Sequence, residues 1–155
     1  MTTLAYDGSC ICSDSMGIGD FICQYPFQKI VTFTEGPYAA IACTGTFNNQ
    51  NKFMDWVQNG GDIPSFQSDD SVSAMAVDRN GKVFCFFSGC HDREEVRAYP
   101  NAEGSGSRFA MGAMMAGATA FRAVEIASQL DPNTGGEVQC YNIETGELTG
   151  PFRQT

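Results

Sequence analysis

The sequence predicts an α+β fold in which two antiparallel β-sheets stack face to face, with helices on the two outer faces. Three observations support this class. The predicted elements follow the order strands, helix, strands, two helices, strand. Short turn signals join neighbouring strands into hairpins. The strands in the middle of the chain are apolar on both faces, as expected for strands buried between two layers.

The first half of the chain is predicted to form two hairpins followed by a helix. The four expected strands cover residues 2–6, 9–14, 29–34 and 38–43. Asp7-Gly8 joins the first pair, and Glu35-Gly36-Pro37 joins the second. Residues 16–28 between the hairpins are predicted to form a loop. Residues 47–58 then place apolar side chains at helical spacing, and Gly60-Gly61 ends this helix.

The second half is predicted to contain another hairpin, two helices and a last strand. The expected elements are strands at 72–78 and 82–88, helices at 107–117 and 120–130, and a strand at 137–143. Arg79-Asn80-Gly81 is the hairpin turn, and Thr119 is positioned to cap the second helix. That helix has a predicted apolar face, made of Phe121, Val124, Ile126 and Ala127. Residues 91–103 and the tail after Gly146 are expected to be irregular.

Length and charge restrict the kind of protein this is. A chain of 155 residues fits one domain, spanning 1–155. The formal net charge of -9 argues against nucleic acid and anionic membranes as partners. With no signal peptide and no apolar run of about 20 residues, we expect a cytoplasmic protein.

The cysteines indicate neither a disulfide framework nor a metal site. Their number, seven, is odd, and no two of them form a CxxC pair. In a cytoplasmic protein we therefore expect reduced thiols, no structural zinc and no cofactor.

The N-terminal sequence Met1-Thr2-Thr3 raises a chemical possibility. A threonine hydroxyl becomes a useful nucleophile when a base accepts its proton. An N-terminal threonine carries such a base in its own α-amine, which has a reference pKa of about 8. Methionine aminopeptidases remove Met1 before a small residue, so Thr2 can become the first residue. The same start also occurs in many unrelated proteins as an ordinary strand end.

Three later residues have the chemistry that this nucleophile requires. Lys29 supplies a cation near the hydroxyl, Asp14 supplies a carboxylate to hold that cation, and the Gly45 N–H can stabilise an oxyanion. Each also has an ordinary interpretation. Asp14 can cap a turn, Lys29 can be a solvated lysine at a strand end, and Gly45 can be a plain turn glycine.

Taken together, these residues follow the pattern of a known family. The chain resembles the proteasome β-subunit family of N-terminal nucleophile (Ntn) hydrolases, which includes the HslV peptidase, and its small size is similar to that of a phage-encoded member. The matching motifs are Thr2-Thr3, Ser13-Asp14, Lys29 before an apolar strand, Thr44-Gly45, Gly104-Ser105-Gly106 and Asp131 to Gly136. The resemblance covers residues 2 to about 145 in the same order.

The resemblance implies a fold and a set of roles. The implied fold is a four-layer αββα sandwich whose first helical layer is reduced, because one short helix and a polar connector replace the usual two long helices. Thr2 is the implied nucleophile, Lys29 paired with Asp14 lowers the local proton affinity, and Gly45 forms the oxyanion hole. The residues implied to surround and tune the Thr2 amine are Ser105, Asp131 and Thr134. Cys43 and Phe47 are implied to line an apolar substrate pocket.

The implied function is threonine-type peptidase activity on peptides or unfolded proteins. The resemblance also implies a homo-oligomer and an ATP-dependent unfoldase partner. Two alternatives remain. One is a catalytically inactive relative that serves as an assembly or interaction protein. The other is an amidase of the wider Ntn class that acts on small amides.

Overall fold

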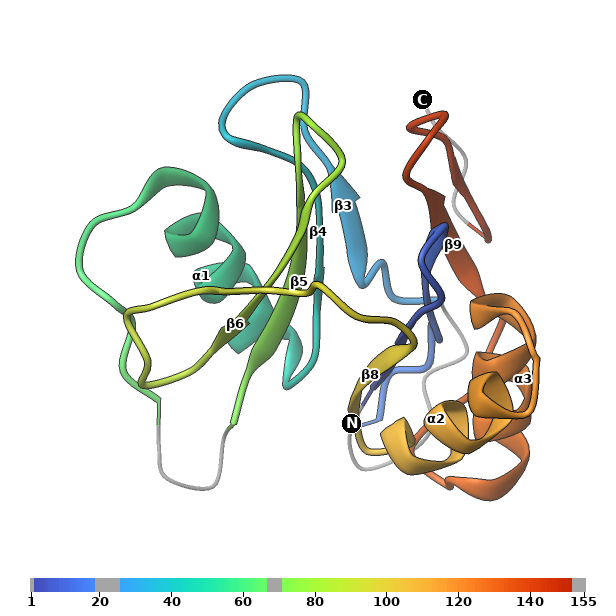
Figure 1. Ribbon diagram of the computed structural model, residues 1–155. Helices are drawn as coiled ribbons and strands as arrows, with labels where there is room; N and C mark the ends of the chain where they lie inside the picture. The colour runs from blue at the N-terminus through green and yellow to red at the C-terminus, as the bar shows by residue number, and fades with distance from the viewer. Residues whose placement is uncertain (1, 19–25, 67–70, 152–155) are drawn as a thin grey trace.

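The fold is a four-layer sandwich of two antiparallel sheets between helical layers, as predicted. The computed structural model of the protein describes residues 2–18, 26–66 and 71–151. One helix covers the outer face of one sheet and two helices cover the outer face of the other (Figure 1). In the described part of the chain, no helix is long and apolar enough to span a membrane.

The two sheets have five strands each. The first sheet has the order β10-β9-β2-β1-β8, and the second has the order β3-β4-β5-β6-β7. The strands of the first sheet are β10 (Leu148–Thr149), β9 (Gln139–Asn142), β2 (Cys10–Ser13), β1 (Thr3–Tyr6) and β8 (Asn101–Gly104). Those of the second are β3 (Ile30–Thr32), β4 (Tyr38–Cys43), β5 (Ser73–Asp78), β6 (Val83–Phe87) and β7 (Glu94–Glu95). All the pairings are antiparallel.

Three apolar clusters hold the four layers together. One lies between the two sheets and contains Leu4, Ile11 and Met75. The second lies between β4–β6 and helix α1 (Phe47–Asn59), with Phe53 at its centre. The third joins the first sheet to α2 (Ser107–Met115) and α3 (Ala120–Leu130), and it consists largely of alanine, which allows close packing.

The turn between β1 and β2 also fastens a helix to the first sheet. Asp7 Oδ1 accepts hydrogen bonds from the Ser9 and Cys10 N–H groups, each at 2.9 Å. Its Oδ2 accepts one from the Ala120 N–H at 2.9 Å, at the first residue of α3. Thr119 caps the same helix as predicted, because its side chain accepts from the Arg122 N–H. Two side chains therefore accept hydrogen bonds from the N-terminus of α3: Asp7 in the β1–β2 turn and Thr119 at the helix cap.

Several predicted elements need correction. The region predicted to be irregular contains β7 and β8, and the tail contains β10. β8 forms because β1 offers it a complete antiparallel partner, from Thr3 opposite Gly104 to Tyr6 opposite Asn101. The predicted strands are also longer than the observed ones by one or two residues at most ends.

The predicted apolar face of α3 is right for Val124 and Ala127 and wrong for Phe121, and Ile126 is half-buried. Phe121 is 44% exposed, whereas the buried residues are Ala120, Ala123, Val124 and Ala127. The small alanines allow the helix to approach the sheet and α2 closely. The larger phenylalanine is left on the outer side.

The expectation of reduced thiols is wrong for one pair of cysteines, whereas Cys10, Cys43, Cys85 and Cys90 are free in the part of the chain that the structure describes. Cys12 on β2 and Cys140 on β9 stand directly opposite each other, and their sulfurs form a disulfide. These two cysteines are separated by 128 residues, so only the register of β2 against β9 brings them together.

Candidate active site

Three of the candidate residues meet at one end of the sandwich, beside the start of the chain. Thr2 precedes β1 and Asp14 follows β2, and the antiparallel pairing of these strands places them side by side. Lys29 precedes β3 of the second sheet. Thr2 and Asp14 are fully buried, and Lys29 is nearly so. The site thus lies where the two sheets face each other.

Asp14 and Lys29 form a buried ion pair. Lys29 Nζ lies 3.0 Å from Asp14 Oδ1, and the two side chains are 4% and 0% exposed. The Thr3 N–H donates to the same oxygen at 3.1 Å, and the Gly135 N–H donates to Oδ2 at 3.1 Å. Burial lowers the pKa of Lys29, while the charge and hydrogen bond of Asp14 act in the opposite direction. The pair therefore places a desolvated ammonium group beside the first residues of β1.

A second cluster surrounds Asp131, at the C-terminal end of α3. Its Oδ2 accepts hydrogen bonds from Ser105 Oγ and Thr134 Oγ1, both at 2.6 Å. Burial acts to raise the pKa of Asp131, but these bonds and one from the Asn133 N–H outweigh it and lower the pKa. Thr134 Oγ1 also lies 2.7 Å from Thr3 Oγ1. Since Thr134 gives its proton to Asp131, Thr3 is the donor of that bond.

Two glycines allow the chain to pass close to the N-terminal residues. A side chain at Gly104 would collide with the carbonyl oxygen of Thr2, and Gly104 has a positive φ of 96°. A side chain at Gly106 would meet Thr3 Oγ1. Between them, the Ser105 N–H donates to the Thr2 carbonyl at 2.9 Å. The predicted Gly104-Ser105-Gly106 motif therefore lies directly against Thr2 and Thr3.

Gly45 lies in the connection from β4 to α1. Its φ of 103° is in the region that favours glycine. Its carbonyl accepts from Gln50 Nε2 at 2.8 Å, which fixes the orientation of the following peptide group. Within the described ranges, the Gly45 N–H donates no hydrogen bond. This amide is thus a hydrogen-bond donor available to an external acceptor.

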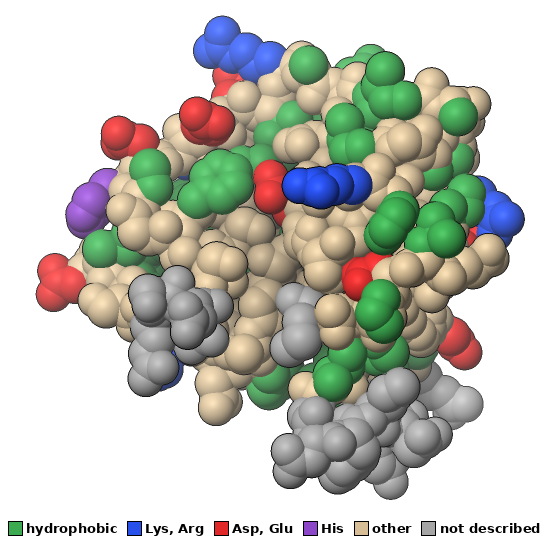
Figure 2. Space-filling view, turned by 90° about the horizontal axis from the view of Figure 1, so that it is seen from below, with side chains coloured by type: hydrophobic (Ala, Val, Ile, Leu, Met, Phe, Trp, Pro, Cys, Tyr) green, Lys and Arg blue, Asp and Glu red, His purple; other side chains and the backbone are tan. Residues whose placement is uncertain are grey.

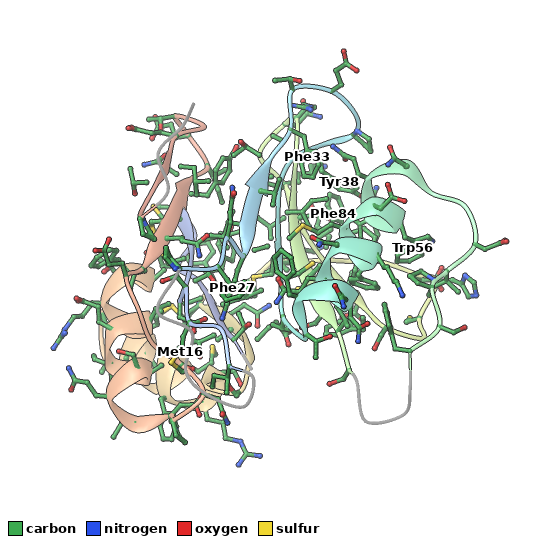
Figure 3. All side chains as sticks on the ribbon, turned by 180° about the vertical axis from the view of Figure 1, so that it is seen from behind. Met16, Phe27, Phe33, Tyr38, Trp56 and Phe84 are labelled. Atoms are coloured by element: carbon green, nitrogen blue, oxygen red, sulfur yellow. A yellow bond between two sulfur atoms is a disulfide. The ribbon has the colours of Figure 1, made fainter. Side chains whose placement is uncertain are left out.

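The two predicted pocket residues have different surroundings. Cys43 is completely buried in the cluster beneath α1, and burial strongly raises the pKa of its thiol. Phe47 is 49% exposed at the start of α1, and its ring packs edge-on against Phe27, with the centroids 5.3 Å apart. Figure 3 shows Phe27 between the two halves of the sandwich, with Met16 below it on the side of α2 and α3. Met16 lies against Gly135. Met16 and Phe27 are each two residues from a member of the ion pair, so the chain segments next to it carry apolar side chains.

Two residues at the site were not predicted from the sequence. Gln50 holds the Gly45 carbonyl, and Gln139 on β9 contacts the backbone around Asp14 and Lys29. A signal existed for Gln139. Side chains alternate between the two faces of a strand, so Gln139 lies on the same inward face of β9 as Tyr141. A polar residue at such a core position is the signal.

The lower face of the molecule carries charged side chains of both signs. In Figure 2, hydrophobic side chains lie among both acidic and basic groups. The described residues contain no group of three or more His, Cys, Asp or Glu side chains able to hold a metal ion.

Comparison with known proteins identifies relatives of the fold. The structure is similar to Anbu (ancestral beta-subunit) from Yersinia bercovieri, with a TM-score of 0.68 and 10% sequence identity over 97% of this chain and 86% of that one. It is also similar to the Anbu complex of Pseudomonas aeruginosa, described as a helical assembly, with a TM-score of 0.63 and 12% identity over 90% of this chain and 80% of that one. The fold is proteasome-like. No family model and no curated protein matches the sequence.

These findings correct the family assignment made from sequence. The chain was expected to be a small, phage-encoded member of the proteasome β-subunit and HslV family, and this is wrong. The two similar structures named above are Anbu proteins, and at 10% and 12% identity they show only the fold. The reason is that motifs of two or three residues, such as Thr2-Thr3 and Ser13-Asp14, indicate the geometry of a site. They do not distinguish between the families that share this geometry.

Proposed function

We propose that the protein is a threonine-type peptidase in which Thr2, exposed by removal of Met1, is the nucleophile. The observation that carries the proposal is the buried pair of Asp14 and Lys29, with Nζ and Oδ1 3.0 Å apart beside the N-terminal strand. A buried ion pair is costly to maintain unless it is well hydrogen-bonded, and pairs of this kind gather at functional sites. We propose further that residues 1–155 act as one domain.

The proposed reaction assigns each group a step. The α-amine of Thr2 accepts the hydroxyl proton while Oγ1 attacks the carbonyl carbon of the scissile bond. The Gly45 N–H donates to the oxyanion that forms, and the Lys29 ammonium lowers the proton affinity near Oγ1. The tetrahedral intermediate then expels the new amine, which takes the proton from the α-amine. This leaves an ester on Thr2, and water hydrolyses it to a carboxylic acid and free Thr2.

The Asp131 cluster supports this assignment. Asp131 with Ser105 and Thr134 lies beside Thr3 and the Thr2 carbonyl, and its lowered pKa keeps it anionic at neutral pH. An anion at this place favours an ammonium state of the nearby α-amine once the amine has accepted the proton. Phe47, with Phe27 beside it, and Cys43 in the cluster beneath α1 are proposed to form an apolar pocket for the residue before the cleaved bond.

The proposed substrates are peptides and unfolded protein segments, because a buried nucleophile admits only an extended chain. A folded substrate must be unfolded first, and we propose that an ATP-dependent unfoldase partner performs this step. We also propose a homo-oligomer, supported by the description of the Pseudomonas aeruginosa Anbu complex as a helical assembly. Light scattering of the purified protein tests this: a monomer at micromolar concentration contradicts it.

The peptidase proposal is tested by intact mass together with hydrolysis of short fluorogenic peptides. We expect the purified protein to lack one methionine mass and to cleave after apolar residues, and we expect Thr2→Ala to abolish cleavage. A protein that retains Met1 and hydrolyses no peptide would refute the proposal. That result would leave the second candidate, a catalytically inactive assembly protein, which the same Anbu description favours.

A further inference from the structure

The fully buried Gln139 lies at the point where the first sheet meets the second. It belongs to β9, next to β2, and its side chain is on the inward face of that strand. Asp14 directly follows β2 of the first sheet and Lys29 directly precedes β3 of the second, so their ion pair bridges the two sheets at the same place.

Among the described residues, the carboxamide of Gln139 bonds to backbone atoms alone. Its Oε1 accepts from the Lys29 N–H at 3.1 Å and from the Ile30 N–H at 3.3 Å. Its Nε2 donates to the Asp14 carbonyl at 3.1 Å and to the Phe27 carbonyl at 2.7 Å. Both N–H groups and both lone pairs of the amide are therefore used. One side chain thus joins the main chain of Asp14 to the main chain of Lys29.

We infer that Gln139 is a positioning residue for the proposed reaction, which fixes the spacing of the two sheets so that Lys29 Nζ meets Asp14 Oδ1 beside Thr2. The inference rests on the proposed function. Gln139 is completely buried, and the four hydrogen bonds given above join it to the main chain beside Asp14 and Lys29. Its effect therefore passes through the backbone of the ion pair. A shift of about 1 Å in a reacting group can lower a rate on the order of 10²-fold, so this spacing matters to catalysis.

The chain offers a matched control for a purely structural role. Gln58 on α1 is also buried and also bonds to backbone atoms. It accepts from the Tyr38 N–H at 3.1 Å, and it donates to the carbonyls of Glu35 at 2.9 Å and Tyr38 at 3.0 Å. These contacts lie at the β3–β4 turn, away from the ion pair. Losing either glutamine leaves buried backbone groups unsatisfied, but only Gln139 touches the candidate site.

The experiment compares Gln139→Met with Gln58→Met in the full chain, at a temperature where thermal unfolding shows both to be folded. We expect kcat for peptide hydrolysis to fall on the order of 10²-fold in Gln139→Met with little change in KM. We expect Gln58→Met to keep the wild-type kcat. Equal losses of kcat in the two variants, or an unchanged kcat in Gln139→Met, would overturn the inference. If Gln139→Met does not fold, Gln139→Glu replaces it, because the carboxylate keeps both acceptor contacts and loses both donor contacts.

A second measurement does not depend on activity. The Lys29 side-chain resonance, assigned by NMR through Lys29→Arg, is titrated with pH in each variant. If Gln139→Met loosens the contact between Lys29 and Asp14, it weakens the charge and the hydrogen bond that raise the pKa of Lys29, so we expect this pKa to fall further below the ordinary value, with no change in Gln58→Met. An unchanged titration in both variants overturns the inference. If the wild-type protein hydrolyses nothing, the proposed function fails and this titration alone decides whether Gln139 positions Lys29.

Discussion

The ion pair of Asp14 and Lys29 makes a quantitative prediction about stability that does not depend on catalysis. Lys29→Met removes the ammonium group and keeps an unbranched apolar stem of similar length. The lost contact is 3.0 Å long, between side chains that are 4% and 0% exposed. Among the described residues, the variant leaves the buried Asp14 carboxylate with hydrogen bonds from the Thr3 and Gly135 N–H groups alone. An uncompensated charge in that place strongly disfavours the folded state.

The expected size of the effect follows from burial. Removing one partner of a buried pair destabilises proteins by about 3–5 kcal/mol. For a chain of this length, each kcal/mol shifts the melting temperature by about 2–4 °C. The product of the two ranges predicts that Lys29→Met melts on the order of 6–20 °C below the wild type.

The assay is a double-mutant cycle measured by thermal and urea unfolding. It compares the wild type, Lys29→Met, Asp14→Asn and the double variant. Each single variant leaves one buried charge, whereas the double variant leaves none. We therefore expect the double variant to be more stable than the sum of the single costs predicts. Arg97→Met is the matched control, because the Arg97 side chain in its pair with Glu95 is 83% exposed and the variant is expected to cost less than about 1 kcal/mol.

Two results would refute this reasoning. One is a Lys29→Met variant whose free energy of unfolding lies within about 1 kcal/mol of the wild type, as for an exposed pair. The other is additivity of the single costs to within about 0.5 kcal/mol, which would mean that the two charges do not interact.

Three further predictions concern other contacts. Asp7→Ala removes one of the two side-chain acceptors at the α3 N-terminus and should cost about 0.5–2 kcal/mol in urea unfolding at pH 7. Burial raises the pKa of Asp7, but hydrogen bonds from the Ala120, Cys10 and Ser9 N–H groups outweigh it and lower the pKa. The Asp7 contribution should therefore be complete above the unfolded pKa near 4 and be lost as the pH falls through the lower folded pKa; a cost that is the same at pH 7 and pH 2 contradicts this. Glu103→Gln should stabilise the protein at pH 7 by about 0.5–2 kcal/mol, because burial raises the pKa of Glu103 and the carboxylate opposes folding above the unfolded value. That gain should vanish in unfolding measured at pH 3, where the carboxyl is protonated in both states, and a gain that persists there points to another cause. Gly104→Ala should lower both stability and peptide hydrolysis because its side chain meets the Thr2 carbonyl, whereas Gly89→Ala, with a similar positive φ and open space around it, should cost only the backbone strain of about 1–2 kcal/mol. Equal melting temperatures and equal rates in those two variants would show that the close approach to Thr2 is unimportant.

The elements that the sequence predicted best are those specified by their own residues. Strand β4 and helix α3 have the predicted bounds, because an apolar β-forming run defines the strand and the Thr119 cap defines the start of the helix. The β5–β6 hairpin was predicted for the same reason, since Asn80-Gly81 specifies its turn. Local chemistry was sufficient in each case.

The missed features depend on distant partners. Strand β8 has no β-branched residue, and it follows Pro100, so it becomes a strand only by pairing with β1. The disulfide depends on the register of β2 against β9. The hydrogen bonds of Gln139 cross 109 to 125 residues of chain, so no short sequence pattern encodes them. The site residues themselves were predicted through short motifs, and the same brevity explains why those motifs located the fold and misassigned the family.

The hydrogen bond between Thr3 and Thr134 also limits how early in synthesis the N-terminus can be enclosed. It joins residues 131 positions apart, so the N-terminal threonines cannot be enclosed until almost the whole chain has been made. At about 5–20 residues per second, synthesis of that interval takes on the order of 7–26 s. Throughout that interval the start of the nascent chain has no Asp131 cluster to pack against. The order of synthesis therefore gives a methionine aminopeptidase several seconds of access to the end of the chain before folding encloses Thr2.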